Sequence, residues 1–331
     1  MRLPLTLLAF VAACGSPPPA AVAPRPAPFA FTFETTLDRD HPLVGRVWDV
    51  AHKRFVTPED TFAALAAAHV ALLGEKHDNP DHHRLQGKMI EALVERGRRP
   101  AVAMEMLDES DQPKVDEVAR THPGDVDAFF QAVGWEGKGW PPAREYAPVV
   151  RAALSNGLPI VAANLPSRET HAIAHHGLEA IDPKVVARFD LASPLPEPLA
   201  SSLRAELVES HCGMLPESML APMALAQRAR DAELAERVAL GKAGGAVLIA
   251  GTGHVRKDRG VPRALARNGE ASVVSVAFAE VAHDQTDPAS YGAEWHAEVP
   301  PFDYVWFTPR ATDADPCEGM RAPKEPVPAS K

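Results

Sequence analysis

The chain has 331 residues, of which 46% are hydrophobic and 24% are charged, a composition typical of a folded globular protein. This length is sufficient for one large domain with a complete hydrophobic core. The formal net charge of −10 argues against non-specific binding to nucleic-acid phosphates, so we expect no nucleic-acid partner.

The N-terminus has the features of an export signal. Arg2 precedes an apolar run, residues 3–11, that is too short to cross a bilayer as a helix. The run ends in Val-Ala-Ala-Cys14, and small residues directly before a cysteine resemble the lipidation site of bacterial lipoproteins. We therefore expect a signal peptide over residues 1–13 and a lipid on Cys14. The protein would be anchored on the cell envelope, at the outer membrane or facing the periplasm; an ordinary secretory signal is the alternative.

Two segments are expected to lack a fixed fold. Residues 14–40 begin with a Pro- and Ala-rich stretch that shows little patterning, which predicts an extended tether between membrane and domain. Residues 309–331 are rich in Pro, Ala and Asp, which predicts a disordered tail.

If Cys14 carries lipid, two cysteines remain, Cys212 and Cys317. In an oxidising compartment two such thiols can pair, although their spacing does not show that they meet. The sequence holds no Cys-x-x-Cys, so a thiolate zinc site has no support.

Five short apolar runs, bounded by turn residues, predict buried strands. They have no polar alternation, as expected for a parallel sheet covered on both faces. The runs are residues 69–74, 100–105, 158–164, 246–251 and 272–277.

Helices are expected between these strands. Thr57-Pro58 and Asn79-Pro80 each place a capping residue before proline, which indicates two helix starts. Residues 149–154 and the Ala-rich residues 221–239 predict further helices. Alternating strands and helices predict an α/β fold, with a parallel wound sheet flanked by helices.

The middle of the chain interrupts this alternation. Residues 112–215 contain one apolar strand and are otherwise helical or irregular, so we expect a smaller helical subdomain inserted there. The α/β core is then expected to comprise residues 41–111 and 216–308.

Polar residues follow four consecutive predicted strands, and ligands bind beyond the carboxyl ends of parallel strands. Two of these ends are Gly-x-x-His turns, Gly74 to His77 and Gly251 to His254. The residues concerned are Gly74, Glu75, His77, His82, His83, Glu105, Asn164, Arg168, Gly251, His254 and Arg256.

Each of these residues also has an ordinary structural interpretation. The glycines can serve turns, Glu75 can cap a helix, a single histidine can lie at the surface, and Glu105 can pair with Arg168. Their joint occurrence at one edge nevertheless favours a site. Imidazole and carboxylate groups together are typical ligands of a divalent metal, here His77, Glu105 and His254, or form an acid–base pair.

Other motifs are excluded by the sequence. Gly251-Thr-Gly253 begins like a dinucleotide fingerprint, but Arg256 stands where the third glycine is required. The chain has no Gly-x-Ser-x-Gly elbow, no Walker loop and no His-Glu-x-x-His.

Several motifs, in the same order, resemble the ChaN-like family of haem-binding, iron-regulated lipoproteins in the Tiki superfamily. The resemblance covers roughly residues 45–308. The motifs are residues 73–86, Met104-Glu105 with Gln112, residues 164–168, Gln227 with Arg230-Asp231, residues 251–256 with 260–262, and residues 303–308. It implies a parallel α/β domain with a smaller helical domain, haem bound in a cleft, and a possible homodimer around the haem. In the same superfamily, paired Gly-x-x-His motifs belong to metal-dependent hydrolases, including membrane-tethered proteases.

The resemblance also points to tyrosine as the haem ligand, and the chain has three tyrosines. Tyr146 is the best candidate, with Trp140 to stack on the porphyrin and Arg144 to meet a propionate. Packing of Tyr146 on the core is the alternative. His211, beside Cys212 and Met214, is a further candidate ligand, although a simple turn closed by Gly213 explains that segment equally well.

Two functions follow from these observations. The first is a haem-binding lipoprotein that acts in iron or haem uptake, without enzymatic activity. The second is a metal-dependent peptidase or esterase in which Glu75 activates a metal-bound water.

Overall fold

The computed structural model describes residues 29–318, so the expected signal peptide and Cys14 lie outside the described residues. The chain divides at Ala30, and the elements below belong to the unit that begins at Phe31. No helix among residues 29–318 is both long enough and apolar enough to cross a bilayer.

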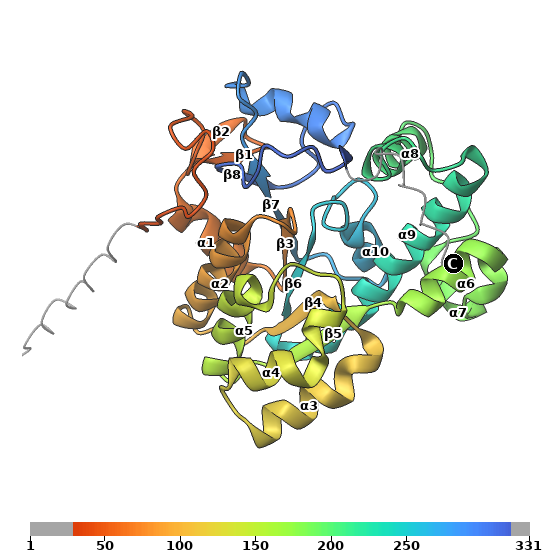
Figure 1. Ribbon diagram of the computed structural model, residues 1–331, viewed down its shortest axis with the longest axis horizontal. Coiled ribbons are helices and arrows are strands. Elements are labelled where there is room, and N and C mark those ends of the chain that lie inside the picture. The colour runs from red at the N-terminus through yellow and green to blue at the C-terminus, as the bar shows by residue number, and fades with distance from the viewer. Residues whose placement is uncertain (1–28, 319–331) are drawn as a thin grey trace, which may run out of the picture. The chain divides into compact units, whose positions relative to one another are not determined.

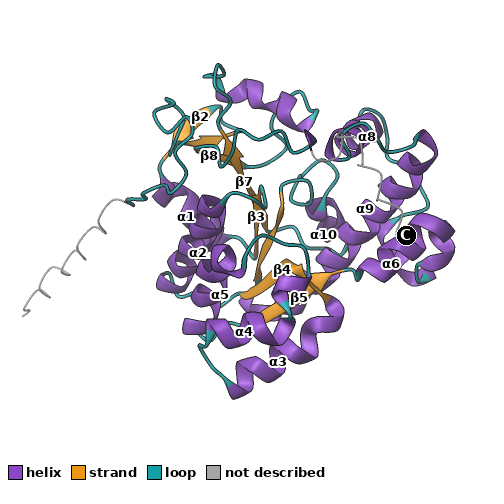
Figure 2. Cartoon of the chain, viewed as in Figure 1, coloured by secondary structure: helices purple, strands orange, loops and turns teal. Residues whose placement is uncertain are grey.

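In the part of the chain that the structure describes, eight strands form one sheet in the order β2-β1-β8-β7-β3-β6-β4-β5 (Figure 2). The six strands from β8 to β5 are parallel, while β1 and β2 form an antiparallel hairpin at the β8 edge. The strands are β1 (Val47–Asp49), β2 (Arg54–Val56), β3 (Val70–Glu75), β4 (Ala101–Asp108), β5 (Ile160–Asn164), β6 (Ala246–Gly251), β7 (Val273–Glu280) and β8 (Tyr304–Thr308). The predicted parallel α/β fold is confirmed.

Helices cover both faces of the sheet, with α1, α2 and α5 on one side and α9 and α10 on the other (Figure 1). The helices are α1 (Pro58–Ala67), α2 (Pro80–Glu95), α3 (Gln112–Thr121), α4 (Val126–Val133), α5 (Ala143–Ser155), α6 (Ser167–His176), α7 (Pro183–Phe189), α8 (Leu199–Ser210), α9 (Glu217–Val238) and α10 (Val261–Arg267). Thr57 and Asn79 cap α1 and α2 as their sequences predict, since each side chain accepts a hydrogen bond from the first helical turn.

The core explains why the central strands are apolar throughout. Alternate residues such as Leu72 of β3 and Leu248 of β6 pack against α9 and α10 in one large cluster. Their neighbours Leu73 and Ile249 are also completely buried, because successive side chains point to opposite faces and both faces carry helices.

The helical middle of the chain is packed against this core. Helix α5 contacts α2, and α6 contacts α9, while β5 completes the sheet edge next to β4. Because the unit from Phe31 onward is a single compact body, the boundaries expected at residues 112 and 215 stay a prediction.

Both expected disordered segments contain ordered residues, which corrects their boundaries. Before residue 40, the amide groups of Glu34 and Thr35 donate hydrogen bonds to the buried carboxylate of Asp81 at 2.8 and 2.9 Å. After residue 309, Arg310 forms an antiparallel bridge with Leu37. The two segments therefore stabilise each other. Because this pairing joins residues far apart in the chain, no local sequence pattern predicts it.

Cys212 and Cys317 form a disulfide, with their Cα atoms 5.5 Å apart. The bond joins the end of α8 to the C-terminal segment across 105 residues of sequence. It thereby holds Cys317, which lies in a segment that the composition alone predicts to be disordered.

Gly74 is required by the close approach of the loop after β6. A Cβ at this position would lie 2.3 Å from Val255 Cγ2 and 3.2 Å from the main chain of Thr252. We expect Gly74→Ala to lower the free energy of unfolding by about 1–3 kcal/mol through overpacking, measured by urea denaturation. The matched control is Gly137→Ala, where the added methyl group would meet nothing within 4 Å. Equal stability of the two variants would show that the end of β3 and the loop after β6 are not packed this closely.

Candidate functional site

The site forms where the carboxyl ends of β3, β6 and β4 meet. The parallel register pairs Glu75 at the end of β3 with Gly251 at the end of β6. On β4, pairing with β5 becomes irregular between Met104 and Asp108, and Glu105 lies in this irregular stretch. Three strand ends therefore deliver their polar residues to one place, as parallel sheets commonly do.

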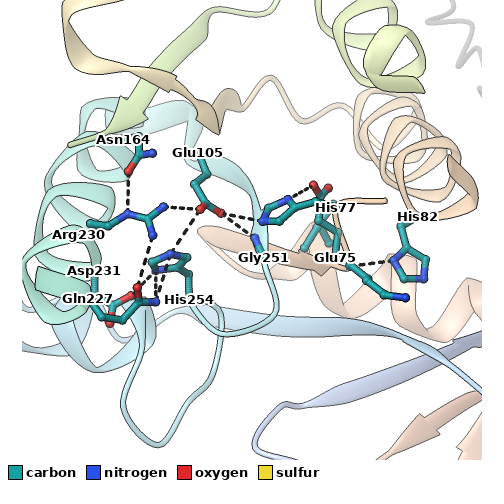
Figure 3. A network of polar contacts seen from close by, with 12 residues as sticks. Glu75, His77, His82, Glu105, Asn164, Gln227, Arg230, Asp231, Gly251 and His254 are labelled. Atoms are coloured by element: carbon teal, nitrogen blue, oxygen red, sulfur yellow. Dashed lines mark hydrogen bonds and ion pairs between the residues drawn. The ribbon is translucent and has the colours of Figure 1, made fainter. Parts of the chain in front are cut away.

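The carboxylate of Glu105 is the centre of the site (Figure 3). It is 2% exposed and accepts hydrogen bonds from Arg230 at 2.5 Å and from the amide of Gly251 at 2.7 Å. The Nε2 atoms of His254 and His77 lie 3.4 and 3.9 Å from its oxygens. One buried carboxylate thus connects both Gly-x-x-His turns.

His77 is held by the neighbouring carboxylate of Glu75. The Nδ1 atom of His77 lies 2.8 Å from Glu75 Oε1. Glu75 also accepts hydrogen bonds from the Tyr146 hydroxyl and from Gln86, the latter at 2.7 Å. Because these partners fix Glu75, the ring of His77 is oriented with Nε2 toward Glu105.

His254 is held in the same manner from the other side. Its Nδ1 atom lies 2.7 Å from Asp231 on α9, and its Nε2 atom faces Glu105. Arg230, next to Asp231, also donates to the side chain of Asn164 at 3.1 Å. Helix α9 thus supplies both a cation and a carboxylate to the strand ends.

The electrostatics of the site favour charged imidazoles. Burial alone would lower the pKa of His254, but the charge of Glu105 and the hydrogen bond to Asp231 raise this pKa to about 9. Burial would likewise lower the pKa of His77, but its contact with Glu75 and the charge of Glu105 raise it. Burial would raise the pKa of Glu105, yet His254 and Arg230 hold it well below its usual range.

His82 and His83 support the site from inside α2 and do not line it. His82 accepts a hydrogen bond from the amide of Lys76 at 3.0 Å, and burial with the nearby charge of His83 lowers its pKa to about 3. His83 stacks on Tyr146 with ring centroids 3.8 Å apart. Both rings therefore position the turn that carries His77.

A cleft of about 590 Å³ opens at these strand ends. Its floor includes Glu75, His77, Glu105 and His254. Its walls come from α8, α9 and the segment near residue 295, and they comprise Leu207, His211, Met223, Gln227, Arg230 and Trp295 among others. The geometric expectation that the two Gly-x-x-His turns share one cleft is met.

Three of the residues expected to contact haem, Tyr146, Trp140 and His211, lie in different environments. Tyr146 is completely buried and does not line the cleft, because its hydroxyl donates a hydrogen bond to the buried carboxylate of Glu75. This corrects the expectation that Tyr146 presents its oxygen to a ligand. Trp140 lies against His77, with ring centroids 4.9 Å apart, and His211 lines the cleft.

Three expected polar residues lie outside the cleft. Arg144 is exposed and next to Glu145, so it does not reach a ligand in the cleft. The side chain of Arg168 is 89% exposed and lies 3.6 Å from Glu169, so it neither lines the cleft nor forms the ion pair with Glu105 that was the structural alternative. Arg256 is completely buried, bonded to Asp258 and to the main chain of Trp295. Sequence position at a strand end did not reveal these side-chain directions.

The predicted metal site is not supported. Among residues 29–318, no three His, Cys, Asp or Glu side chains converge in a way that could hold a metal ion. Arg230 donates to one oxygen of Glu105, and the Gly251 amide donates to the other. The positive charge of Arg230 against Glu105 opposes the binding of a second cation at the same carboxylate.

Arg230 and Asp231 were not among the predicted site residues, although they contact its centre. The available signal was that Gln227 with Arg230-Asp231 is one of the motifs that carry the resemblance to the ChaN-like family. Gln227, one turn earlier, lies 3.3 Å from His254 Nε2 and lines the cleft.

Because the pKa of His254 is raised, its ionisation stabilises the fold at low pH. This contribution is complete below the ordinary histidine pKa of 6.5 and is lost as the pH rises through about 9, with an upper bound of about 3 kcal/mol. We expect the difference in free energy of unfolding between wild type and His254→Gln to shrink over this range, measured by urea denaturation. The exposed His176→Gln is the control and should track the wild type. A difference that grows with pH would contradict the assigned environment.

The chain is similar to a family of known proteins. A family profile described as "Haem-binding uptake, Tiki superfamily, ChaN" matches residues 61–265, more than half of the chain. No curated protein matches the sequence significantly.

Solved structures are also similar to the chain. One described as "Cofacial heme binding to ChaN of Campylobacter jejuni" is 21% identical, covers 78% of this chain and 95% of its own, and has a TM-score of 0.57. A Bacillus cereus protein is 11% identical with a TM-score of 0.44, covering 76% of this chain and 90% of its own. The first of these supports the fold, and the profile match establishes that the chain belongs to the ChaN family of the Tiki superfamily.

Proposed function

We propose that the chain binds haem in the cleft above β3, β4 and β6, with His211 as the iron ligand. The cleft volume of about 590 Å³ is within the range of about 300–1,000 Å³ that is common for small-molecule sites. Family membership supports haem as the ligand.

The residues of the cleft fit a haem group. Leu207, Met223 and Trp295 provide apolar contact area for a porphyrin. His211 provides the iron ligand, because its Nδ1 atom lies 2.8 Å from the carbonyl oxygen of Leu207. This contact fixes the ring, and Nε2 has no hydrogen-bond partner among the described residues. In metal-binding histidines, one ring nitrogen is usually held by a hydrogen bond in this way while the other binds the metal.

His211 has a better position than the other histidines of the cleft. His77 and His254 already direct Nε2 toward Glu105, and His296 Nε2 lies 2.8 Å from Glu209. The free Nε2 of His211 is thus the observation that carries the proposal. The adjacent disulfide at Cys212 holds the end of α8, and with it His211, in place.

The biological role proposed with haem binding is iron or haem uptake by a lipoprotein. The anchor would be lipid on Cys14, which the small residues before it favour. The protein would then be held on the cell envelope by a lipid and not by a spanning helix. Pairing of two copies around the haem is part of the same proposal.

Titration with haemin tests the ligand assignment. We expect a Soret shift that saturates with the wild type, and at least a tenfold loss of affinity, about 1.4 kcal/mol, in His211→Ala. Tyr146→Phe should retain the Soret spectrum, because the buried hydroxyl does not face the cleft. The control is His176→Ala on the exposed end of α6. A spectrum altered by Tyr146→Phe and unaffected by His211→Ala would reverse the assignment.

A second candidate function, hydrolysis by proton transfer without a metal, is favoured by one observation. His77 and His254 each have Nδ1 held by a carboxylate, at 2.8 and 2.7 Å, and each directs Nε2 into the cleft toward Glu105. Because the pKa values of His77 and His254 are raised, these imidazoles can donate a proton to the leaving group of a substrate, and Arg230 can stabilise the negative charge that develops. An ester or a peptide bond is the substrate class expected.

This candidate predicts hydrolysis of p-nitrophenyl acetate that resists a chelator. His77→Asn should lower kcat/KM by about 100-fold or more, since general acid–base catalysis contributes on that scale. The exposed His171→Asn on α6 is the control. Absence of turnover, or turnover that is equal in His77→Asn, would leave haem binding as the function.

A further inference from the structure

A second cavity, of about 530 Å³, lies between the 191–197 loop, α8 and α9. It shares no lining residue with the cleft described above. Its wall is largely aliphatic and includes Leu191, Leu195, Leu203, Leu220 and Leu225. An open cavity of this size with an aliphatic wall suits a flexible apolar chain.

Arginines are concentrated at one end of this cavity. Arg228 lines both the cavity and a small adjoining hollow, which Arg263 and Arg267 also line. The guanidinium of Arg228 donates only to the carbonyl oxygens of Asp190 and Leu191, at 2.8 and 3.1 Å. The arginine end therefore meets the aliphatic cavity at a residue that has no carboxylate partner within hydrogen-bond distance.

The balance of charge at this end is positive. Arg267 is paired with Asp190 at 2.8 Å, and Asp231 in the hollow is bonded to His254 at 2.7 Å. Arg263 has no ion pair or hydrogen bond among the described residues that would neutralise it. Two guanidinium groups, those of Arg228 and Arg263, thus lack a carboxylate partner beside an apolar cavity.

At the cavity itself, the other lining arginine is paired with a carboxylate, while the lining carboxylate of Glu197 keeps its charge and is hydrogen-bonded to a hydroxyl. Glu197 accepts a hydrogen bond from the hydroxyl of Ser201 at 2.7 Å, and Arg204 is paired with Glu217. The remaining recognition elements are an aliphatic wall and unpaired arginines. Together they are complementary to one long chain that ends in a carboxylate.

We propose that this cavity binds a free fatty acid, with its alkyl chain among the leucines and its carboxylate at Arg228 and Arg263. Haem is also apolar and carries carboxylates, but the cavity lining holds no His, Tyr, Cys or Met that could ligate iron. The site is thus separate from the cleft proposed for haem, and neither proposal depends on the other.

Calorimetric titration of the protein with dodecanoate tests the proposal. We expect saturable binding to one site and an affinity about tenfold lower in Arg263→Gln. Dodecanol, which has the same chain without the charge, should bind more weakly and should not respond to Arg263→Gln. Ala221→Trp should abolish binding of both, because Ala221 lines the cavity and is exposed enough to accept a larger side chain.

Matched controls separate the site from general effects of charge and bulk. Arg151→Gln removes an exposed arginine on α5, and Ala119→Trp adds an indole on the exposed face of α3. Both should bind dodecanoate as the wild type does. Neither position lines the cavity.

Three outcomes would overturn the proposal. The first is absence of saturable dodecanoate binding, and the second is unchanged binding in Ala221→Trp. The third is that Arg263→Gln weakens binding of haemin, or of vesicles containing anionic phospholipid, while dodecanoate binding is unaffected. Haemin binding that responds to His211→Ala and not to Arg263→Gln would leave both sites as assigned.

Discussion

Glu105 accepts hydrogen bonds from Arg230 and from the amide of Gly251, with His254 and His77 close to its oxygens. A carboxylate that is 2% exposed can remain charged only when donors and cations surround it. These partners come from β6, the turn after β3, and α9, so satisfying one buried charge requires three distant segments to meet. Keeping Glu105 ionised in the folded protein consequently depends on the assembly of the site.

The same requirement decides which chemistry the site can perform. Arg230 places a positive charge against Glu105, which opposes a second cation there, and no metal-binding geometry is formed among the described residues. The site then consists of two oriented imidazoles, a carboxylate and a guanidinium, from His77, His254, Glu105 and Arg230 respectively. The histidine without such a partner, His211, lies on the wall and is therefore the one available to an external ligand.

Buried polar groups also lie beneath the residues that line the cleft. Tyr146 and Gln86 donate to Glu75, and His83 stacks on Tyr146. Tyrosine suggests iron ligation, but Tyr146 instead supports the buried carboxylate of Glu75. Its role follows from where α5 packs against α2, which is a property of the tertiary fold.

The α/β class, the parallel central strands and the starts of α1 and α2 could be predicted, because strand burial on both faces and helix capping are local patterns. The strand ends that hold Glu75, His77, Glu105 and His254 could be predicted for the same reason. The antiparallel β1–β2 hairpin could not be, since strands of three residues carry no periodicity. The roles of Tyr146, Arg168 and Arg256 depend on side-chain direction, and the contributions of Arg230 and Asp231 depend on how α9 crosses the sheet. Contacts between segments more than 100 residues apart, such as Arg230 with Glu105, arise only when the whole chain packs, and the tertiary structure alone decides them.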